Sequence, residues 1–365
     1  MISKIYIDNY KCFTNFELSF SHINVIFGKN GVGKSSIFEL LEKIRLLISG
    51  LAKTDIFLPM ETTRWDRRNL QTFGIDAISL NHQYNYRIDI FHDYKGSPKI
   101  QSEELKCDGK VIVKFSKGEA QVFNDNYSPG PLFPLDPSQS VLSIISSEMG
   151  YNKVFKFKKI LTNLLIVKLD PEVIFPLSDK EVVFPKKDMS NFVDWYRHLS
   201  QEHQQNIIQL QLKLRDVLPG FQGIDLPSYS PTHRGFQVSF KIAGLNTIIP
   251  FAFSELSDGQ RALIILYTLL YGIKGLEYIL CIDEPENFVS LEEIQPWLME
   301  ALDSSGSDLN QVLIISHHPE AIDYLAAEHG IWLDREENGP VKRKEIRLSS
   351  EEPLKLSQLI ERGWD

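Results

Sequence analysis

Hydrophobic and polar positions alternate along the first part of the chain with a period of two, which is typical of β-strands. Ile5–Ile7 and Phe16–Phe20 follow this pattern, and the fully apolar run Ile23–Phe27 comes after them. From Lys34 to Ser49 the apolar residues recur at helical spacing, and Gly50 follows as a stop signal. The pattern therefore predicts strands that lead into a glycine-rich turn and then a helix.

Alternation returns over residues 75–123, which predicts an antiparallel sheet. Within this stretch Asp108-Gly109 separates Glu104–Cys107 from Lys110–Phe115, and this dipeptide is typical of a two-residue hairpin turn. The prolines between Tyr127 and Asp136 predict a loop.

A mostly helical segment follows as far as Leu218, and its clearest helix is predicted over Asn191–Leu218, before Pro219-Gly220. Strand-like alternation resumes in Gln237–Ile242. No internal repeat and no low-complexity tract interrupts the chain, so we expect no linker between independent domains.

Two later apolar runs end in residues that can carry chemistry. Tyr278–Ile282 is followed by Asp283-Glu284, and Val312–Ile315 is followed by Ser316-His317. Short apolar runs are typical of strands buried on both faces of a parallel α/β sheet. Ligands in such sheets bind at the carboxyl ends of the strands, so we expect these polar residues to line a site.

Composition and charge limit the class of protein. The 365 residues are 43% hydrophobic and 24% charged, which is ordinary for a globular protein that is soluble in water. There is no apolar run long enough for a membrane span and no recognisable signal peptide, and the three cysteines lack metal-type spacing, so we expect a cytoplasmic protein without membrane contact. The net charge of −9 argues against a protein that holds DNA with its whole surface. Three local basic clusters exist, although such clusters are more often solvated surface: Arg64, Arg67 and Arg68; Lys153, Lys156, Lys158 and Lys159; Lys186 and Lys187.

The most specific motif lies between the apolar run and the first helix. Gly28–Ser35 fits the phosphate-loop pattern G-x-x-x-x-G-K-[ST] at every fixed position. Backbone N–H groups of such a loop surround a polyphosphate, its lysine reaches the β- and γ-phosphates, and its hydroxyl binds Mg²⁺. The expected phosphate-binding residues are Gly28, Asn30, Gly31, Gly33, Lys34, Ser35 and Ser36, with Ser35 also a ligand of Mg²⁺.

The two acids after Tyr278–Ile282 have separate expected roles. We expect Asp283 to anchor Mg²⁺, directly or through water, and Glu284 to polarise the water that attacks the γ-phosphate. Pro285 ends the strand there, so that the two carboxylates can divide these tasks. We expect His317 to lie near the γ-phosphate, with the adjacent His318 as the alternative.

Ser257, Gly259 and Gln260 open another apolar helix. Ser257 and Gln260 have the spacing of an N-terminal capping box. The same helix start is also a second anion site, which could hold a γ-phosphate of this subunit or of another one.

Taken together, these motifs resemble the ABC-type ATPases. In the order of that family, Gly28–Ser35 resembles Walker A, Leu256–Gln260 the signature, Tyr278–Glu284 Walker B, and Ser316-His317 the switch histidine. The signature departs from the family at Asp258, where the pattern has glycine. The opening Ile5–Phe13 resembles the SMC/RecF/OLD branch, and Asp283–Asn287 and Ser316–Pro319 are similar to a group of bacterial ATPases classed as AAA_21.

This resemblance implies a fold and a layout. We expect an α/β P-loop NTPase of ABC-ATPase type, with a mixed sheet, an antiparallel β-subdomain and a helical lobe. A single domain over residues 1–365 would comprise N-terminal strands with Walker A (1–74), the β-subdomain (75–124), a helical insertion (125–220) and the signature, Walker B and histidine lobe (221–365). A long SMC-type coiled coil is excluded, because the one clear helix spans only about 40 Å at about 1.5 Å per residue.

The resemblance also implies an ATPase with ATP and Mg²⁺ that works as a homodimer or higher oligomer, in which one subunit's signature completes the other's ATP site. The family's Mg²⁺-sensing glutamine would be Gln71, with Gln83 as the alternative, although both positions are more typical of surface residues. Fewer than fifty residues follow His317, too few for the Toprim nuclease of OLD proteins, so a nuclease effector would be a separate polypeptide.

Three functions compete. The first is an ATP-hydrolysing switch that controls a separate effector, such as a Toprim-type nuclease, in bacterial phage defence. The second is a RecF-like DNA-repair ATPase that binds DNA directly, although an acidic chain is expected to bind it weakly on its own. The third, a transporter subunit, is disfavoured by the roughly 220 residues between Lys34 and Ser257 and by the opening strands.

Overall fold

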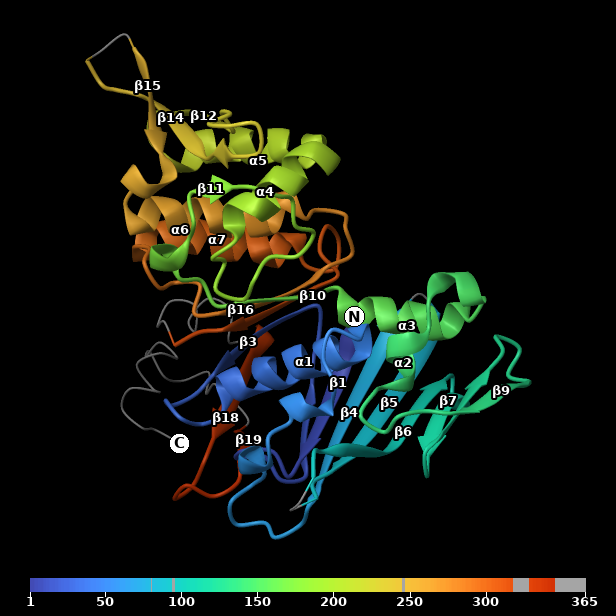
Figure 1. Ribbon diagram of the computed structural model, residues 1–365. Helices are drawn as coiled ribbons and strands as arrows, with labels where there is room; N and C mark the ends of the chain where they lie inside the picture. Colours follow the sequence, from blue (N-terminus) through green and yellow to red (C-terminus); the bar gives the residue numbers. More distant parts are fainter. Residues whose placement is uncertain (80, 94–95, 245–246, 318–327, 345–365) are drawn as a thin grey trace. The chain divides into compact units, whose positions relative to one another are not determined.

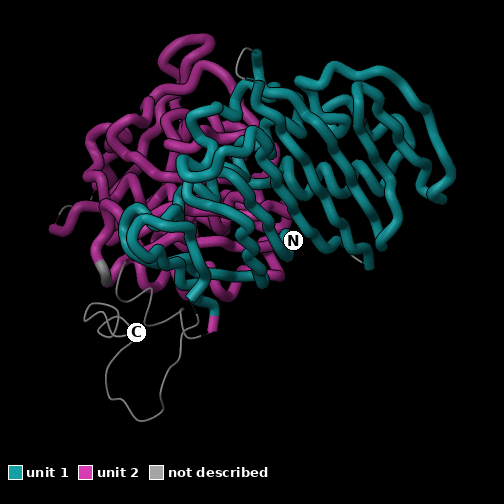
Figure 2. The backbone as a smooth tube through the Cα atoms, turned by 90° about the horizontal axis from the view of Figure 1, so that it is seen from below, with its two compact units in different colours: residues 1–164, 329–349 teal, residues 165–328, 350–365 magenta. Residues whose placement is uncertain are grey.

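The computed structural model describes residues 1–79, 81–93, 96–244, 247–317 and 328–344, and it divides the chain into two units. Unit 1 contains residues 1–164 and 329–349, and unit 2 contains residues 165–328 and 350–365 (Figure 2). Each unit buries apolar residues of its own.

Unit 1 contains an eight-stranded antiparallel sheet (Figure 1). In spatial order its strands are β2 (Phe16–Ser19), β1 (Ile2–Asp8), β4 (Leu70–Ser79), β5 (His82–Phe91), β6 (Lys99–Cys107), β7 (Lys110–Ser116), β8 (Glu119–Phe123) and β9 (Pro129–Pro134). The alternation in the sequence places one side chain in two on the face that packs against the helices α2 (Val141–Ile144) and α3 (Asn152–Thr162), and α1 (Lys34–Ser49) packs on these two helices. Tyr84 and Tyr86, for example, both pack on Phe157 of α3, with ring centroids 5.6 and 5.5 Å apart.

The predicted hairpin turn is confirmed. Cys107 pairs with Lys110 across it, and both Asp108 and Gly109 are left-handed, with φ of 52° and 78°. The loop predicted over Tyr127–Asp136 is wrong in part, because β9 lies within it. Proline is compatible with β9 because this strand is at the edge of the sheet, where one row of N–H groups needs no partner.

A second group of strands in unit 1 carries the phosphate loop. The apolar run is β3 (Ile23–Phe27), which pairs in parallel with β18 (Gly330–Asp334), and β18 pairs antiparallel with β19 (Lys342–Lys344). The chain leaves β3 through the glycine-rich turn into α1, which ends at Gly50 in a left-handed conformation, as predicted.

Unit 2 contains the strands that lead to Asp283-Glu284 and to Ser316-His317. Strands β10 (Leu164–Val167), β16 (Ile279–Asp283) and β17 (Gln311–Ile315) are neighbours in this order, and β16 and β17 are parallel. The helices are α4 (Phe192–Glu202), α5 (Gln204–Val217), α6 (Asp258–Tyr267), which continues as a π-helical turn over Thr268–Gly272, and α7 (Leu291–Ser304). One small antiparallel sheet contains β12 (Phe221–Asp225), β14 (Gln237–Lys241) and β15 (Ile248–Ala252). Another contains β11 (Leu177–Ser178) and β13 (Arg234–Gly235). Short 3₁₀ turns occur in the two units at Thr54–Ile56, Pro59–Glu61, Ser147–Met149, Pro171–Val173 and Phe253–Glu255.

Two predictions for this region need correction. The helix expected over Asn191–Leu218 is two helices, because His203 leaves the helical conformation with φ −131° and ψ 50°. The segment expected to be mostly helical also contains β10, a fully buried strand. Four apolar residues in a row show no period that separates a buried strand from a turn of buried helix.

Candidate nucleotide-binding site

The phosphate loop has the backbone that its glycines make possible. Gly28, Gly31 and Gly33 all have positive φ, at 150°, 78° and 105°. A Cβ atom on Gly28 would lie 2.3 Å from the carbonyl oxygen of Leu333, and one on Gly33 would lie 2.7 Å from Sγ of Cys12. Both the conformation and the close packing therefore require glycine at these two positions.

Lys34 begins α1 and is 7% exposed. Its ammonium donates hydrogen bonds to the carbonyl oxygens of Gly28, at 2.7 Å, and Lys29, at 3.2 Å. The lysine side chain thus folds back over its own loop, where its charge can instead be offered to phosphate oxygens. Asn30 is exposed in the same loop, and Ser35 and Ser36 follow in the first turn of α1, at the end of the helix whose dipole favours anions.

The sequence did not indicate a further cation at this loop. Arg335 follows β18 and donates from Nη1 to the carbonyl oxygen of Gly31 at 3.1 Å. Its guanidinium carbon also lies 5.9 Å from the ring centroid of Trp65, which is 48% exposed. Arg335 therefore belongs with the loop in unit 1, although no motif marks it.

In unit 2 Asp283 is the last residue of β16, and Glu284 follows it directly. Asp283 is 2% exposed and pairs with Ile315 of β17. Glu284 has a left-handed φ of 56°, and its backbone N–H donates to the carbonyl oxygen of Ile315 at 2.8 Å. This conformation turns the chain directly after Asp283, so that the two carboxylates do not simply alternate across the sheet. A non-glycine residue held there costs about 1–3 kcal/mol, and such residues cluster at functional sites.

The structure brings Glu284 and His317 together. Nδ1 of His317 lies 3.4 Å from Oε1 of Glu284. The backbone of His317 is held by Glu286, whose Oε1 accepts from its N–H at 3.2 Å and from the Ser316 hydroxyl at 2.8 Å. The sequence marked Glu286 only as part of the family resemblance, but it is the buried group that positions the histidine.

Lys168 is a second residue that the sequence did not single out. It follows β10, and its ammonium lies 3.3 Å from Oε2 of Glu284 and 3.8 Å from Oδ2 of Asp283. Burial would raise the pKa of Glu284, but the hydrogen bond and charge of Lys168, with smaller contributions from Asn287 and His317, hold that pKa below its usual value. The pKa of Lys168 is raised in return, because the two carboxylates outweigh the effect of its burial.

The signature helix begins as the capping box predicts. The Ser257 hydroxyl accepts from the N–H of Gln260 at 3.3 Å, and Oε1 of Gln260 accepts from the N–H of Ser257 at 3.1 Å. Asp258 pairs with Arg261 one turn further on. A Cβ on Gly259 would lie 3.1 Å from the carbonyl oxygen of Phe288, so this glycine packs closely on the segment that follows the two acids.

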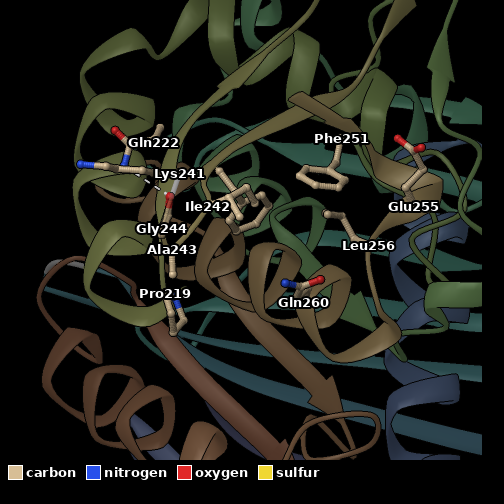
Figure 3. A pocket seen from close by; sticks show the side chains of 12 residues that line it. Pro219, Gln222, Lys241, Ile242, Ala243, Gly244, Phe251, Glu255, Leu256 and Gln260 are labelled. Atoms are coloured by element: carbon tan, nitrogen blue, oxygen red, sulfur yellow. Dashed lines mark hydrogen bonds between the residues drawn. The ribbon is translucent and has the colours of Figure 1, made fainter. Parts of the chain in front are cut away.

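A cavity of about 590 Å³ borders the same helix (Figure 3). Phe240 and Phe251 from the β14–β15 hairpin form apolar walls, and Leu256 and Gln260 complete it on the helix side. A molecule in this cavity would therefore touch the glutamine that caps the signature helix.

The two glutamines proposed as Mg²⁺ sensors differ in burial. Gln83 is exposed, as expected, but the expectation of a surface position is wrong for Gln71, which is fully buried in unit 1. Its amide donates to the carbonyl oxygen of Asn9 at 2.9 Å, and its Oε1 lies 2.8 Å from Nε2 of His92. A role of Gln71 in sensing Mg²⁺ stays a prediction. His318, the alternative to His317, lies outside the described residues.

Comparison with known proteins agrees with this reading of the chain. Residues 23–323 match the family AAA_21, described as "AAA domain, putative AbiEii toxin, Type IV TA system". A protein of Helicobacter pylori named "ATP/GTP phosphatase" is 24% identical over 352 residues, which cover 89% of this chain and 87% of that protein.

Solved structures of SMC heads share the fold. An SMC head bound to the C-terminal winged-helix domain of ScpA aligns with a TM-score of 0.56 and 13% identity over 99% of both chains. The Pyrococcus furiosus SMC head, bound to the C-terminal domain of ScpA, aligns with a TM-score of 0.52 and 11% identity over 99% of this chain and 98% of that one. The expected ABC-type, SMC-like ATPase fold and the expected ATPase activity are thereby confirmed.

None of the helices in the described residues is long and apolar enough to cross a membrane.

Proposed function

The chain belongs to the AAA_21 family of ATPase domains, and we propose that it is a molecular switch in which ATP drives self-association and hydrolysis reverses it. The switch controls a separate effector protein, such as a Toprim-type nuclease, in bacterial phage defence. In this proposal, ATP binding and hydrolysis serve to turn the effector on and off.

The observation that carries the proposed chemistry is the contact between Glu284 and His317 at the ends of two parallel strands. A carboxylate held ionised beside Lys168 is suited to accept a proton from an attacking water. His317, held by Glu286, can orient the same water or contact the γ-phosphate. The left-handed backbone of Glu284 supports the same assignment, because strained backbone conformations of this kind cluster at functional sites.

The residues that would hold ATP and Mg²⁺ have suitable chemistry. Lys34 and the N–H groups of the phosphate loop would hold the β- and γ-phosphates. Mg²⁺ prefers oxygen donors, and the carboxylate of Asp283 and the hydroxyl of Ser35 are such donors. Bound Mg²⁺ would neutralise charge on the phosphates during hydrolysis.

Self-association would use the signature helix. Ser257 is exposed at the start of α6, where the capped helix still presents its positive end to an anion. If this end binds the γ-phosphate of a second copy, ATP bridges two subunits and hydrolysis removes the bridge. The result is a two-state device driven by the nucleotide.

A protein partner is supported by the relatives. Two of the SMC heads with this fold were solved in complexes with parts of ScpA. The family description names a toxin–antitoxin system, which supports a role in a bacterial system of more than one component. Purification of the tagged chain with ATP, followed by mass spectrometry, should recover a nuclease or other effector. Recovery of replication proteins would instead favour the RecF-like function, and recovery of a membrane permease the transporter function.

The test of the switch uses Glu284→Gln. Loss of the general base should lower ATP turnover by about 10²–10⁴-fold while ATP still binds. Sedimentation of this variant should show a monomer without nucleotide and a dimer or larger species with ATP and Mg²⁺. Glu292→Gln, an exposed acid on α7, is the matched control and should hydrolyse ATP normally. Normal ATP turnover in Glu284→Gln would show that Glu284 is not the general base. If the variant binds ATP without hydrolysing it and stays monomeric, the proposed switch is wrong.

A further inference from the structure

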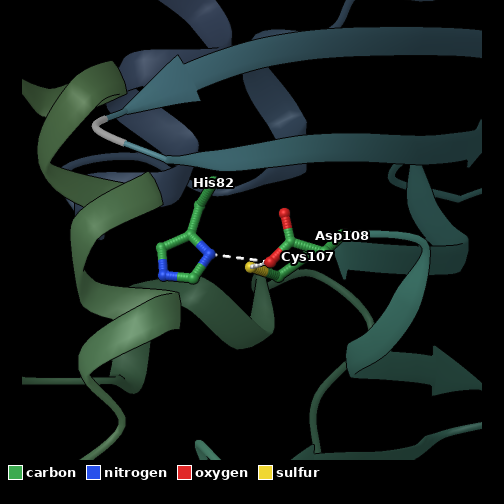
Figure 4. A group of neighbouring side chains, drawn as sticks. All are labelled: His82, Cys107 and Asp108. Atoms are coloured by element: carbon green, nitrogen blue, oxygen red, sulfur yellow. Dashed lines mark hydrogen bonds and ion pairs between the residues drawn. The ribbon is translucent and has the colours of Figure 1, made fainter.

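Three side chains of metal-binding type meet at one end of the antiparallel sheet of unit 1, and none of them belongs to the phosphate loop, the signature or the pair Asp283-Glu284. His82 begins β5, Cys107 ends β6, and Asp108 is the first residue of the following turn. Their side chains point toward one another (Figure 4), and the nitrogen, sulfur and oxygen donors all lie within 4.8 Å of one another.

The backbone of the sheet holds this arrangement. The N–H of Asp108 donates to the carbonyl oxygen of Gln83 at 2.8 Å, and Oδ1 of Asp108 accepts from the N–H of Gln83 at 3.0 Å. These two bonds leave Oδ2 directed at the other two donors. It lies 2.7 Å from Nδ1 of His82 and 3.6 Å from Sγ of Cys107.

We propose that His82, Cys107 and Asp108 form a binding site for one zinc ion. Thiolate and imidazole ligands favour zinc and similar borderline metals over Mg²⁺ and Ca²⁺, and a carboxylate oxygen is also a zinc ligand. Zinc–ligand bonds of about 2.0–2.3 Å in a tetrahedron place ligand atoms about 3.3–3.7 Å apart. The sulfur–oxygen distance already meets this requirement, and the nitrogen–oxygen pair must open by about 0.6 Å.

That opening is feasible because two of the three side chains are near the surface. The side chains of His82 and Asp108 are 30% and 40% exposed, whereas Cys107 is buried. On binding, the thiol proton of Cys107 leaves to solvent, and the imidazole proton moves to Nε2 so that Nδ1 can face the metal. The fourth position of the tetrahedron is left for water.

Two lysines lie near the three ligands, and the ligands themselves supply the negative charge that a cation needs. The Tyr127 hydroxyl lies 3.5 Å from Oδ2 of Asp108, and Lys110 and Lys153 stand over the Tyr127 ring. The nearer ammonium, that of Lys153, donates to the carbonyl oxygen of Asp125 at 2.7 Å. A bound thiolate and carboxylate together carry two negative charges, which match the charge of the ion. The bound metal would cross-link the turn after β6 to the start of β5.

The test uses the full chain, stripped of metal with a chelator and kept free of nucleotide. Zinc alone should bind with one strong site and raise the midpoint of thermal unfolding. Cobalt, as a spectroscopic probe, should give a thiolate-to-metal charge-transfer band. Cys107→Ser should abolish that band, and His82→Gln should lower zinc affinity by more than about tenfold, since even changes to groups that only orient metal ligands cost about 10–100-fold.

Two controls separate this site from others in the chain. Cys12→Ser and Cys281→Ser change the other two cysteines, both of them buried, and should keep the cobalt band. His82→Gln changes a half-exposed side chain, so it keeps the test valid if Cys107→Ser does not fold. Equal zinc affinity in the wild type and His82→Gln, or a charge-transfer band that depends on another cysteine, would overturn the proposal. A zinc site lost only with Asp283→Asn would place the metal at the acids of unit 2 and would overturn it equally.

Discussion

The ammonium of Lys168 lies 3.3 Å from the carboxylate of Glu284, the residue proposed as general base. The same ammonium is 3.8 Å from Asp283, so one lysine faces both acids that follow β16. It therefore helps to keep the base ionised in a half-buried setting that would otherwise favour the protonated acid. A positioning role of this kind should appear in the pH dependence of hydrolysis.

Lys168→Ala should move the acidic limb of the ATPase pH profile to higher pH. Only ionised Glu284 accepts a proton, and that form is present above its pKa, which Lys168 lowers. Without the lysine, burial is left to raise the pKa, and the active form appears only at higher pH. Measurement of kcat/KM against pH checks this, with Lys168→Arg expected to restore much of the wild-type profile. A slower enzyme with an unmoved acidic limb would show that Lys168 does not act through Glu284.

Lys34→Ala should weaken ATP binding. The ammonium that bonds to the loop carbonyls of Gly28 and Lys29 is the cation that we propose for the β- and γ-phosphates. Hydrogen bonds to charged groups contribute about 1.5–3 kcal/mol, so we expect a loss of affinity of about 10–100-fold. Titration with a fluorescent ATP analogue measures the change, and Lys53→Ala, an exposed lysine near Asp136, should bind normally. Equal affinity in both variants would contradict the phosphate-loop assignment.

Ser257→Arg should block hydrolysis while leaving ATP binding by the phosphate loop intact. The arginine would crowd the end of α6 that is proposed to meet a second subunit's nucleotide. Loss of the cap alone costs about 1 kcal/mol of stability, and Ser257→Ala measures that part without adding bulk. If Ser257→Arg hydrolyses ATP normally, the serine is only a helix cap.

A mixture of Ser257→Arg with Lys34→Ala should regain part of the lost activity. Each mixed dimer has one site with both defects and one site with neither. Activity that stays at zero, although mixed dimers are shown to form, would mean that the site is not shared or that the two sites must fire together.

Duplex DNA should bind weakly to the isolated chain and dissociate as salt rises. The net charge is −9, and several members of the basic clusters are already paired. Arg68 is held by Asp8 and Asp66, and Lys158 donates to the carbonyl oxygens of Ser143 and Ile145. Fluorescence anisotropy should show little binding at about 200 mM salt, where few phosphate contacts survive. Tight binding there, without a partner, would favour the RecF-like function.

The sequence predicts those backbone conformations that depend on only a few adjacent residues. The phosphate loop, the Asp108-Gly109 turn and the Ser257–Gln260 cap lie where the sequence predicted them, because each depends on the conformations that its own residues allow. The apolar runs before Asp283 and Ser316 are likewise strands, since burial on both faces leaves them no polar face.

Only the tertiary structure decided which distant groups meet. Lys168 beside Glu284, Glu286 beneath His317, and Arg335 on Gly31 join positions that no local pattern connects. Tertiary packing also set the burial of Gln71. Periodicity describes the faces of one segment, whereas these contacts depend on the path of the whole chain. Ion pairs and hydrogen bonds form between side chains that the folded backbone brings close, whatever their separation in sequence.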